Sequence, residues 1–529
     1  MYPESNDPNS KLLLLDGQQR LSTIKQYSEN SLRFWKPNNH DVYMNYFNAI
    51  RAMVMQLGSG ADAPFSESIL DDLITGKKDE AEWADDVAPY DKDARGELRS
   101  IIKEIRDHVK HYVNLEDLGI LAIKFTGSKE HIADVFANLN KGGMPLSKYE
   151  IFSAAWVNEA IALLAQGESE FQDEILDNVK SYYSRMSQNA EFELNNFSED
   201  ELSQSRSITL SEFGIALGAF VQKRLSSLVS DSPASINEIG FGLLGIAMDL
   251  DNRSLSTLNE QLPLIRKSIQ TILDKTDAIC TNLQDIFAKL LKRICATKNN
   301  EYAGGLTSTF KTLSYFAALW DLDPSSTDYK TSLKNIRSYY VYDYWTNSWT
   351  SHGDQRLFDY YPAIKKRTYL KPLTDEAFKD AYDRWSTDIT PSINFAKEVQ
   401  SLVTIHANLT YLAGTIPYGE SFELEHIIAK KRLNASEDQS NRQVFGGSIG
   451  NCMYLPKLVN NKKKDKTLYE VGENARFSQL IQDSHYFTNS EFEAIFSSLE
   501  SKDFETVNSF IVRRGKSVAD DLVDHLLKN

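Results

Sequence analysis

Cysteine is scarce in this chain of 529 residues. The three that occur, Cys280, Cys295 and Cys452, are far apart and form no C-x-x-C pair. This spacing excludes a disulfide framework and a cysteine-bound zinc site. Because free cysteines are typical of a reducing compartment, we expect a cytoplasmic protein.

Long apolar runs are also missing. No stretch reaches the roughly 20 apolar residues that a membrane-spanning helix needs, so we expect no membrane partner. The opening residues, MYPESNDPNS, are polar and resemble neither a signal peptide nor a transit peptide. With 41% hydrophobic and 25% charged residues, the composition is that of a soluble globular protein. The length predicts two to four domains, by the usual domain size.

Positively charged residues are in the minority: the chain has 58 Lys and Arg and 74 Asp and Glu, which gives a net charge of −16. Such a balance is unfavourable for binding nucleic acid. Between residues 421 and 470, however, basic residues outnumber acidic ones nine to six, and phosphate contacts need only a local basic patch. The residues that we predict to contact DNA are Lys430, Lys431, Arg432, Lys462, Lys463 and Lys464. The alternative is that these lysines form an ordinary solvated surface.

The same region carries the residues best suited to catalysis. Alternating apolar positions from Phe422 predict a short strand that ends at Glu425 and His426. A polar loop follows, then a second strand over residues 449–455, and then a helix over residues 457–469. Asn451 lies on the second strand and Asn460 in the first turns of the helix.

These residue types fit the hydrolysis of a phosphodiester. A carboxylate from Glu425 and an amide oxygen from Asn460 suit one Mg²⁺ or Mn²⁺ ion. His426 is then available as the general base. The alternatives stay open at this point: a Glu-His pair is often an ordinary surface pair, loop Asn residues often serve turns, and Asn461 is a substitute for Asn460.

The order strand, loop, strand and helix, with Glu-His, Asn and Asn in sequence, resembles the ββα-metal nuclease fold of HNH endonucleases. The resemblance implies that Asn451 braces the His-bearing loop instead of binding metal. One departure is Ala429, where relatives often have Pro after the His.

A second motif lies near the start of the chain. Residues 11–25 read KLLLLDGQQRLSTIK, which predicts a buried strand, a turn at Asp16-Gly17 and a helix from Gln18. A strand that leads through a glycine turn into a helix N-terminus favours anion binding, and Arg20 adds a partner for phosphate. Alternatively, Asp16 caps the helix and Arg20 pairs with a carboxylate.

Residues 136–150 hold a third motif, FANLNKGGMPLSKYE. Its Asn140 and Gly143 lie in a tight loop whose backbone can approach a ligand closely. Together with DGQQR, this pattern resembles the ParB-like N-terminal domain of GmrSD-type restriction proteins. The resemblance implies a nucleotide site made of Asp16, Gly17, Gln18, Gln19, Arg20, Asn140 and Gly143.

Relatives of that domain carry an I-P-x-Y-Q-R-type motif upstream of DGQQR, and this chain does not. We therefore expect an N-terminally incomplete ParB-like domain. Binding of an NTP is an expectation, and its hydrolysis is left open.

The middle of the chain is dominated by helical periodicity, most clearly over residues 272–296. Residues 339–371 interleave aromatic and basic side chains, which either stack on a nucleic-acid base or pack a domain junction. The predicted fold class is α+β and mostly helical. The predicted domains are residues 1–155 with a helical insertion at about 30–115, a helical linking domain at 156–400, and a ββα nuclease domain at 401–529.

The combined resemblance implies a GmrSD-like, modification-dependent (type IV) restriction endonuclease, related to Ssp-type effectors that sense phosphorothioation. Its partner would be modified DNA inside a bacterial cytoplasm, with nucleotide as a regulator. A homodimer or companion defence subunits are open alternatives. The rival functions are a ParB-like regulator that binds DNA or nucleotide and has an inactive nuclease domain, and an HNH toxin that acts on RNA or unmodified DNA.

Overall fold

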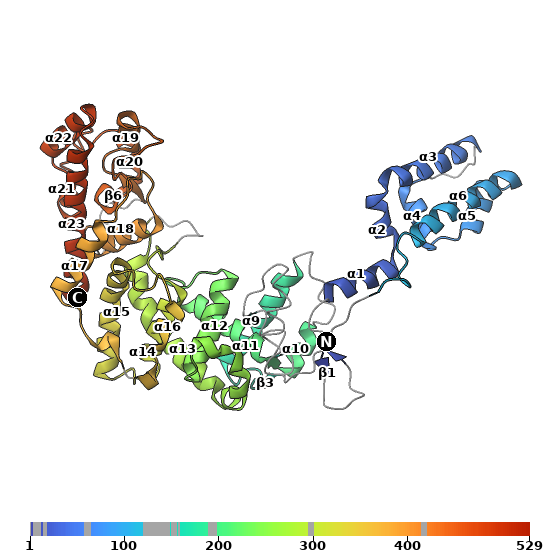
Figure 1. Cartoon of the computed structure of the whole chain (residues 1–529), viewed down its shortest axis with the longest axis horizontal. Helices are drawn as coiled ribbons and strands as arrows, with labels where there is room; N and C mark the ends of the chain where they lie inside the picture. Colours follow the sequence, from blue (N-terminus) through green and yellow to red (C-terminus); the bar gives the residue numbers. More distant parts are fainter. Residues whose placement is uncertain are drawn as a thin grey trace. The chain divides into compact units, whose positions relative to one another are not determined.

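The computed structural model describes residues 2–3, 12–13, 18–57, 65–119, 149, 156, 159–188, 198–294, 301–364, 366–413 and 421–528. The protein is mostly helical with short two-stranded sheets, as predicted (Figure 1). It divides into two compact units, residues 1–141 and 142–529. Within the described residues, no helix combines the length and the apolar character needed to cross a membrane.

A hydrophobic core lies between residues 32 and 109 of the first unit, whose described residues form a series of helices. They are α1 (Gln18–Glu29), α2 (Leu32–Asn38), α3 (His40–Gln56), α4 (Glu67–Thr75), α5 (Glu80–Val87) and α6 (Lys92–Lys110). The side chains of Ser66, Asp79 and Asp91 accept hydrogen bonds from the first turns of α4, α5 and α6. The helical character predicted for residues 30–115 is therefore observed in α2 to α6.

A two-residue strand pair lies in the same unit. β1 (Tyr2–Pro3) pairs antiparallel with β2 (Leu12–Leu13), inside the leucine run for which a strand was predicted. The helix predicted from Gln18 is α1, which continues to Glu29.

The helical middle of the chain forms the first part of the second unit. Its helices are α9 (Glu170–Ser187), α10 (Glu199–Ser205), α11 (Leu210–Arg224), α12 (Pro233–Ala247), η3 (Asn252–Gln261), α13 (Leu262–Leu291), α14 (Thr309–Leu319), α15 (Thr327–Trp345), α16 (Gly353–Phe358), η4 (Pro362–Ile364), η5 (Thr368–Leu370) and α17 (Asp375–Ser386). The strands β3 (Ala160–Ala162) and β4 (Ser207–Thr209) pair antiparallel beside them. The helix predicted over residues 272–296 lies largely within α13, which begins earlier because Pro263 fits a first turn.

Helices α11 and α12 approach each other unusually closely. A Cβ atom added at Gly218 would lie 1.9 Å from the carbonyl oxygen of Ile236, and one added at Gly240 would lie 1.9 Å from that of Gly214. Glycine is needed at both positions because the two backbones are in direct contact there.

The aromatic segment at residues 339–371 is packed inside the second unit. Tyr340, Trp345 and Tyr369 are at most 2% exposed, and their rings contact other aromatic rings. Lys366 and Arg367 pair with Asp359 and Asp328 at the surface. This placement favours the packing interpretation over stacking on nucleic-acid bases.

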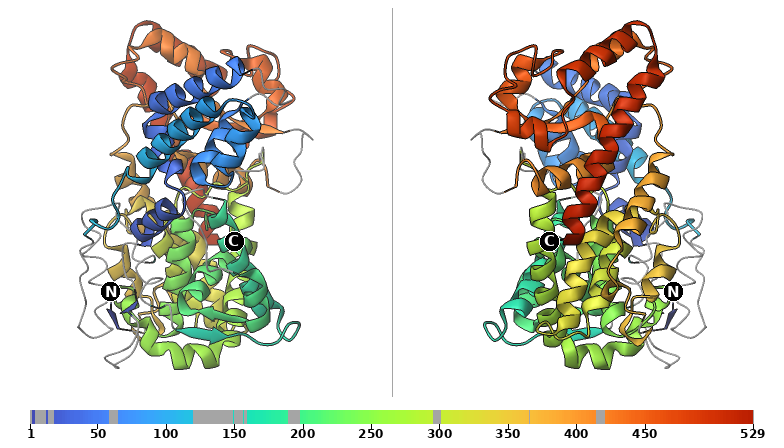
Figure 2. Two further views of the ribbon diagram at one scale, coloured as in Figure 1. Left: turned by 90° about the vertical axis from the view of Figure 1, so that its right-hand side faces the viewer. Right: turned by 90° about the vertical axis from the view of Figure 1, so that its left-hand side faces the viewer.

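The remaining elements bring the chain to its last described residue. They are α18 (Lys397–Leu409), β5 (Phe422–His426), α19 (Lys430–Ser436), η6 (Ile449–Asn451), β6 (Cys452–Pro456), α20 (Lys457–Lys463), α21 (Ser478–Asp483), α22 (Asn489–Glu500) and α23 (Phe504–Lys528). The long helix α23 packs against α15, α17, α18, α22 and η6, and Figure 2 shows it along this end of the unit.

β5 and β6 form an antiparallel pair in which His426 lies opposite Cys452. Three expectations need correction. The second strand begins at Cys452 and not at Ile449, so Asn451 lies in the short helix η6 before it. The helix α20 ends at Lys463 because Lys464 has a positive φ of 49°, which a right-handed helix cannot contain. The polar loop after His426 contains a helix, α19.

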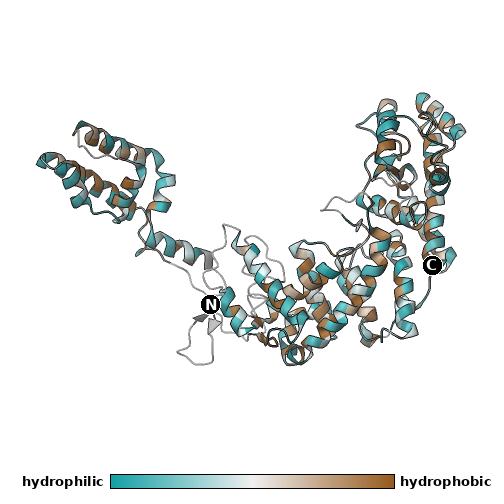
Figure 3. Cartoon of the chain, turned by 180° about the vertical axis from the view of Figure 1, so that it is seen from behind, coloured by the Kyte–Doolittle hydropathy of each residue, from teal (hydrophilic) through white to brown (hydrophobic). Residues whose placement is uncertain are grey.

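One hydrophobic core runs through the second unit, from Tyr149 to Leu526, and apolar faces turn inward along its helices (Figure 3). The predicted boundary at residues 400 and 401 falls inside α18. That helix packs against α13, β6 and α23.

Candidate active site around His426

The site is built where β5 ends, with α20 along one face of the strand. Because side chains alternate along a strand, Glu423 and Glu425 face α20. Asn460 and Lys463, one turn apart on α20, contact these two carboxylates. Asn460 Nδ2 donates to Glu423 Oε2 at 3.3 Å, and Lys463 Nζ donates to Glu425 Oε1 at 3.0 Å.

Lys463 is fully buried. Its ammonium also donates to the carbonyl oxygen of His426 at 3.0 Å. Burial lowers the pKa of Lys463, and the neighbouring Glu425 opposes that shift. This placement speaks against the DNA contact that we expected of Lys463, because its charge is used inside the fold.

The His426 imidazole is held in a defined orientation. Nε2 lies 2.7 Å from the carbonyl oxygen of Ile393, and since a carbonyl only accepts, Nε2 carries the proton. The lone pair is therefore on Nδ1. The ring also stacks on Phe395, with ring centroids 3.9 Å apart.

Burial is the main cause that lowers the pKa of His426 to about 4, and the positive charges of Lys430 and Lys463 act in the same direction. The imidazole is thus neutral near neutral pH. A neutral imidazole with a fixed tautomer is able to accept a proton from water.

Asn451 is completely buried and holds the segment that follows His426. Its Oδ1 accepts from the backbone N–H of Ile428 at 2.7 Å, and its Nδ2 donates to the carbonyl oxygens of Gly446 and Ile428. These contacts are the kind of bracing that the resemblance implied.

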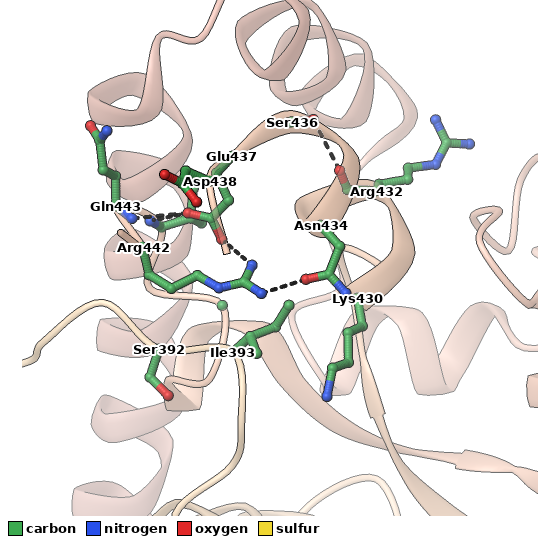
Figure 4. A network of polar contacts seen from close by, with 12 residues as sticks. Ser392, Ile393, Lys430, Arg432, Asn434, Ser436, Glu437, Asp438, Arg442 and Gln443 are labelled. Atoms are coloured by element: carbon green, nitrogen blue, oxygen red, sulfur yellow. Dashed lines mark hydrogen bonds and ion pairs between the residues drawn. The ribbon is translucent and has the colours of Figure 1, made fainter. Parts of the chain in front are cut away.

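A network of polar side chains orders the loop between α19 and η6. Figure 4 shows Arg442 between Glu437 and Asn434, with hydrogen bonds of 2.7 and 2.6 Å to them. The other oxygen of Glu437 accepts from the backbone N–H groups of Gln443 and Val444. The loop is thereby fixed next to Ile393 and Lys430.

The remaining side chains that we predicted to contact DNA lie on the surface and differ in how many contacts they make with other residues. Lys430 is exposed and its Nζ lies 3.0 Å from Asn394 Oδ1, while Lys431 and Lys462 make surface ion pairs with Asp465 and Glu473. Arg432 is tied to Glu470 and lies over the Phe496 ring. Lys464 is exposed. Surface pairs of this type are weak, so a phosphate can replace the acidic partner.

The oxygen donors that could hold a divalent cation are Glu425, Asn460 and, in addition, Glu423, which the sequence did not single out. Carboxylate and amide oxygens are suitable ligands for Mg²⁺ or Mn²⁺. The structure does not join Glu425 and Asn460 directly, because Asn460 contacts Glu423 and the Glu425 carboxylate holds Lys463. A cation at Glu425 would have to share that carboxylate with Lys463 or displace it.

Most of the expected nucleotide site lies outside the described residues. This applies to Asp16, Gly17, Asn140 and Gly143. For Gln18 and Gln19 the backbone is described and opens α1, and the exposed Arg20 follows in its first turn.

The structure also brings together three residues that sequence reasoning missed. His406 and His485 both place Nε2 within hydrogen-bonding distance of Asp521 Oδ2, at 3.0 and 2.7 Å. They are separated from Asp521 by 115 and 36 positions, so no local spacing signals the cluster.

Comparison with known proteins gave one match. Residues 1–157 match the family model described as GmrSD restriction endonuclease, N-terminal domain. No curated protein and no solved structure matched the chain. The match shows that this N-terminal part of the chain is similar to the corresponding domain of GmrSD restriction endonucleases.

Proposed function

We propose that this chain, whose residues 1–157 match the N-terminal domain of GmrSD restriction endonucleases, is a metal-dependent DNA endonuclease of a modification-dependent restriction or phage-defence system. The cutting site would be the region around His426. The observation that carries this proposal is the partly buried imidazole of His426, whose proton is fixed on Nε2 by Ile393 and which directly follows Glu425 in the chain. That arrangement supplies a general base, and the residue before it in the chain supplies a carboxylate oxygen.

In the proposed reaction, His426 Nδ1 takes a proton from a water molecule. The water oxygen forms a bond to phosphorus as the bond from phosphorus to the leaving oxygen breaks, and that oxygen acquires a proton from solvent. The Ile393 carbonyl keeps the ring oriented and stabilises the positive charge that develops on it. A Mg²⁺ or Mn²⁺ ion held by Glu425 and Asn460, with Glu423 as a further ligand, would offset charge on the phosphate and the leaving oxygen.

Lys430, Lys431, Arg432, Lys462 and Lys464 are proposed to position the DNA backbone beside this site. Because the whole chain is strongly acidic, binding would depend on these local contacts and would weaken steeply with salt. Recognition of a modified base or backbone and control by a nucleotide at the DGQQR motif are parts of the same proposal.

A regulator with an inactive nuclease region is the second candidate. The observation that favours it is the ion pair between Glu425 and Lys463, because a carboxylate already neutralised by an ammonium is a weaker metal ligand. The two candidates differ in whether His426 is needed.

A plasmid cleavage assay with Mg²⁺ or Mn²⁺ separates them. Three DNA substrates are compared, with and without NTP: unmodified DNA, DNA with glucosyl-hydroxymethylcytosine, and phosphorothioate DNA. Each is tested with the protein of the printed sequence and with His426→Ala. The control variant is His108→Ala, which removes an exposed imidazole in α6. We expect cleavage of one modified substrate, a loss of about 10²–10⁴-fold in His426→Ala, and no loss in the control.

Each other result has a defined meaning. Equal activity of His426→Ala would contradict the catalytic role of this residue. Cleavage that ignores modification would favour a toxin. Restriction in cells that survives His426→Ala would favour the regulator.

A further inference from the structure

His406, His485 and Asp521 come from three different segments and converge on one point. His406 belongs to α18, His485 follows α21, and Asp521 lies on α23. One ligand atom from each, two imidazole nitrogens and a carboxylate oxygen, all lie within 4.8 Å of one another.

The surroundings leave the carboxylate without a strong cationic partner among the described residues. The nearby Arg514 guanidinium is occupied by the carbonyl oxygens of Ile449, Cys452, Ser484 and His485. Burial lowers the pKa of His406. Burial alone would raise the pKa of Asp521, but the hydrogen bonds from the two imidazoles outweigh this effect and lower the pKa below its usual range.

The donor set is that of a transition metal and not of Mg²⁺. Imidazole nitrogen and carboxylate oxygen together suit Zn²⁺, which takes such ligands at about 2.0–2.2 Å in a tetrahedral arrangement. That geometry spaces neighbouring ligand atoms by roughly 3.3 Å. The observed separations of 2.7 and 3.0 Å from Asp521 Oδ2 would have to widen by only a few tenths of an ångström.

The cluster is also accessible from solvent on one side. The His485 and Asp521 side chains are 35% and 30% exposed, while His406 is 2% exposed. Two ligands therefore have room to adjust, and water can take a fourth position.

We propose that His406, His485 and Asp521 form a Zn²⁺ site that fastens α18 and α23 together. α18 packs on β6 and α23 packs on η6. An ion that joins α18 to α23 would therefore also stabilise the position of the β5–β6 pair. The proposal is independent of the nuclease proposal, because none of its ligands belongs to the site around His426.

Metal binding is tested on the full chain after dialysis against a chelator. Zn²⁺ content is measured by elemental mass spectrometry, and Co²⁺ is titrated as a coloured substitute whose visible absorption reports tetrahedral coordination. We expect one equivalent of metal per chain and a higher melting temperature with Zn²⁺ than with chelator.

Two variants remove ligands without opening the core. His485 has a left-handed backbone with φ of 54°, so His485→Gly removes the imidazole at a position that glycine tolerates. Asp521→Asn keeps the size of the side chain and removes its charge. Each should lower Zn²⁺ affinity by more than the roughly 10–100-fold that loss of an outer hydrogen-bonding partner costs.

Two controls exclude other sites. His525→Ala removes a half-buried imidazole of the same helix, and Glu425→Gln alters the proposed catalytic metal site; both should bind Zn²⁺ like the unmodified chain. If no stoichiometric metal binds, or if His485→Gly binds it equally well, the cluster is a hydrogen-bonded His-Asp-His group and the proposal is wrong. Loss of binding in Glu425→Gln alone would assign the metal to the His426 site and would also overturn it.

Discussion

Asn451 shows how one buried amide holds the candidate active site together. Replacement by Ala would leave the N–H of Ile428 and the carbonyl of Gly446 without their partner in a fully buried place. Each unsatisfied group costs about 1–3 kcal/mol. We therefore expect Asn451→Ala to lower the free energy of unfolding by about 2–4 kcal/mol, measured by urea denaturation.

Asn441→Ala is the matched control, because that side chain is exposed in the loop that precedes η6. Its free energy of unfolding should change by less than about 0.5 kcal/mol. Similar losses in both variants would contradict the bracing role of Asn451.

The neighbours Lys462 and Lys463 provide a second comparison of single residues. Lys463→Met removes one partner of a buried pair and should cost about 3–5 kcal/mol of stability. Lys462→Met removes an exposed charge and should leave stability within about 0.5 kcal/mol. Denaturant unfolding measures both effects.

DNA affinity should depend on the exposed Lys462 and not directly on the buried Lys463. If Lys462 contacts a phosphate, its loss reduces the slope of log affinity against log salt by about one, as fluorescence anisotropy at several salt concentrations would show. An unchanged slope in Lys462→Met would remove Lys462 from the interface.

At this scale the sequence predicted residue types better than it predicted exposure. The resemblance carried by the order Glu-His, Asn, Asn implied a bracing role for Asn451, and in the structure its amide uses both its acceptor and its donor on neighbouring backbone groups. Lys463 was assigned to a DNA-contacting surface because it lies in a basic segment beside the candidate site. Helical spacing could have indicated that Lys463 is buried, because it lies four positions after the apolar Val459 and therefore on the same face of α20.

Among the elements, the contact between α11 and α12 depends on the absence of side chains. Gly240→Ala would place a methyl group 1.9 Å from the carbonyl oxygen of Gly214, so the helices must separate. We expect a loss of about 3 kcal/mol or more in the free energy of unfolding, at the upper end of the cost of overpacking. Thermal and urea denaturation would measure it.

Gly96→Ala serves as the opposite case. This glycine lies exposed in α6 with open space around its Cβ position, so Ala should stabilise the helix by about 0.5–1 kcal/mol. A loss at Gly96, or no loss at Gly240, would contradict the described packing.

The buried Lys311 in α14 predicts a pH dependence. Its Nζ donates to the carbonyls of Tyr340 and Leu306, and burial lowers the pKa of Lys311 from 10.5 to about 8. Between these values the unfolded chain binds more protons than the folded one, so the free energy of unfolding rises with pH.

Lys311→Met lacks this titration. The difference in free energy of unfolding between the unmodified chain and the variant should therefore increase by about 2 kcal/mol from neutral pH to about pH 9.5. A difference that stays constant over this range would show that Lys311 does not change its charge.

The sequence predicted elements whose periodicity is strong and missed boundaries that depend on a single backbone conformation. α13 and β5 were found because apolar spacing is clear in both. The end of α20 depends on the positive φ of Lys464, for which Lys gives no signal. The short helix η6 depends on packing against α23, which no local pattern contains.

For the whole molecule, two separate cores predict two unfolding events. Trp83 belongs to the core of residues 1–141 and Trp345 to the core of residues 142–529. Each Trp→Ala change should remove about 3–5 kcal/mol from its own unit. In calorimetry, Trp83→Ala should lower one transition temperature and Trp345→Ala the other. A single transition that both variants lower equally would contradict the division.

Long-range placement is what the sequence could not supply. The region that matches the family ends at residue 157, whereas the first compact unit ends at residue 141. Tyr149 and Trp156 lie within the matched region but belong to the core of the second unit. His406, His485 and Asp521 meet only through the packing of α18 and α23, which is decided by the whole core and not by spacing along the chain.

The segment before α18 reaches back to the candidate site. Ile393 fixes the His426 tautomer, Asn394 contacts Lys430, and Ser392 accepts from the N–H of Gly447. A fragment cut at residue 401 would contain each predicted catalytic and metal-binding residue and still lack the carbonyl that orients its base. The candidate site is therefore not contained in the residues after 401. Chimeras that exchange it between proteins would have to carry the stretch from about Thr390 with it, and the sequences on the two sides of residue 401 would have to change together over evolution.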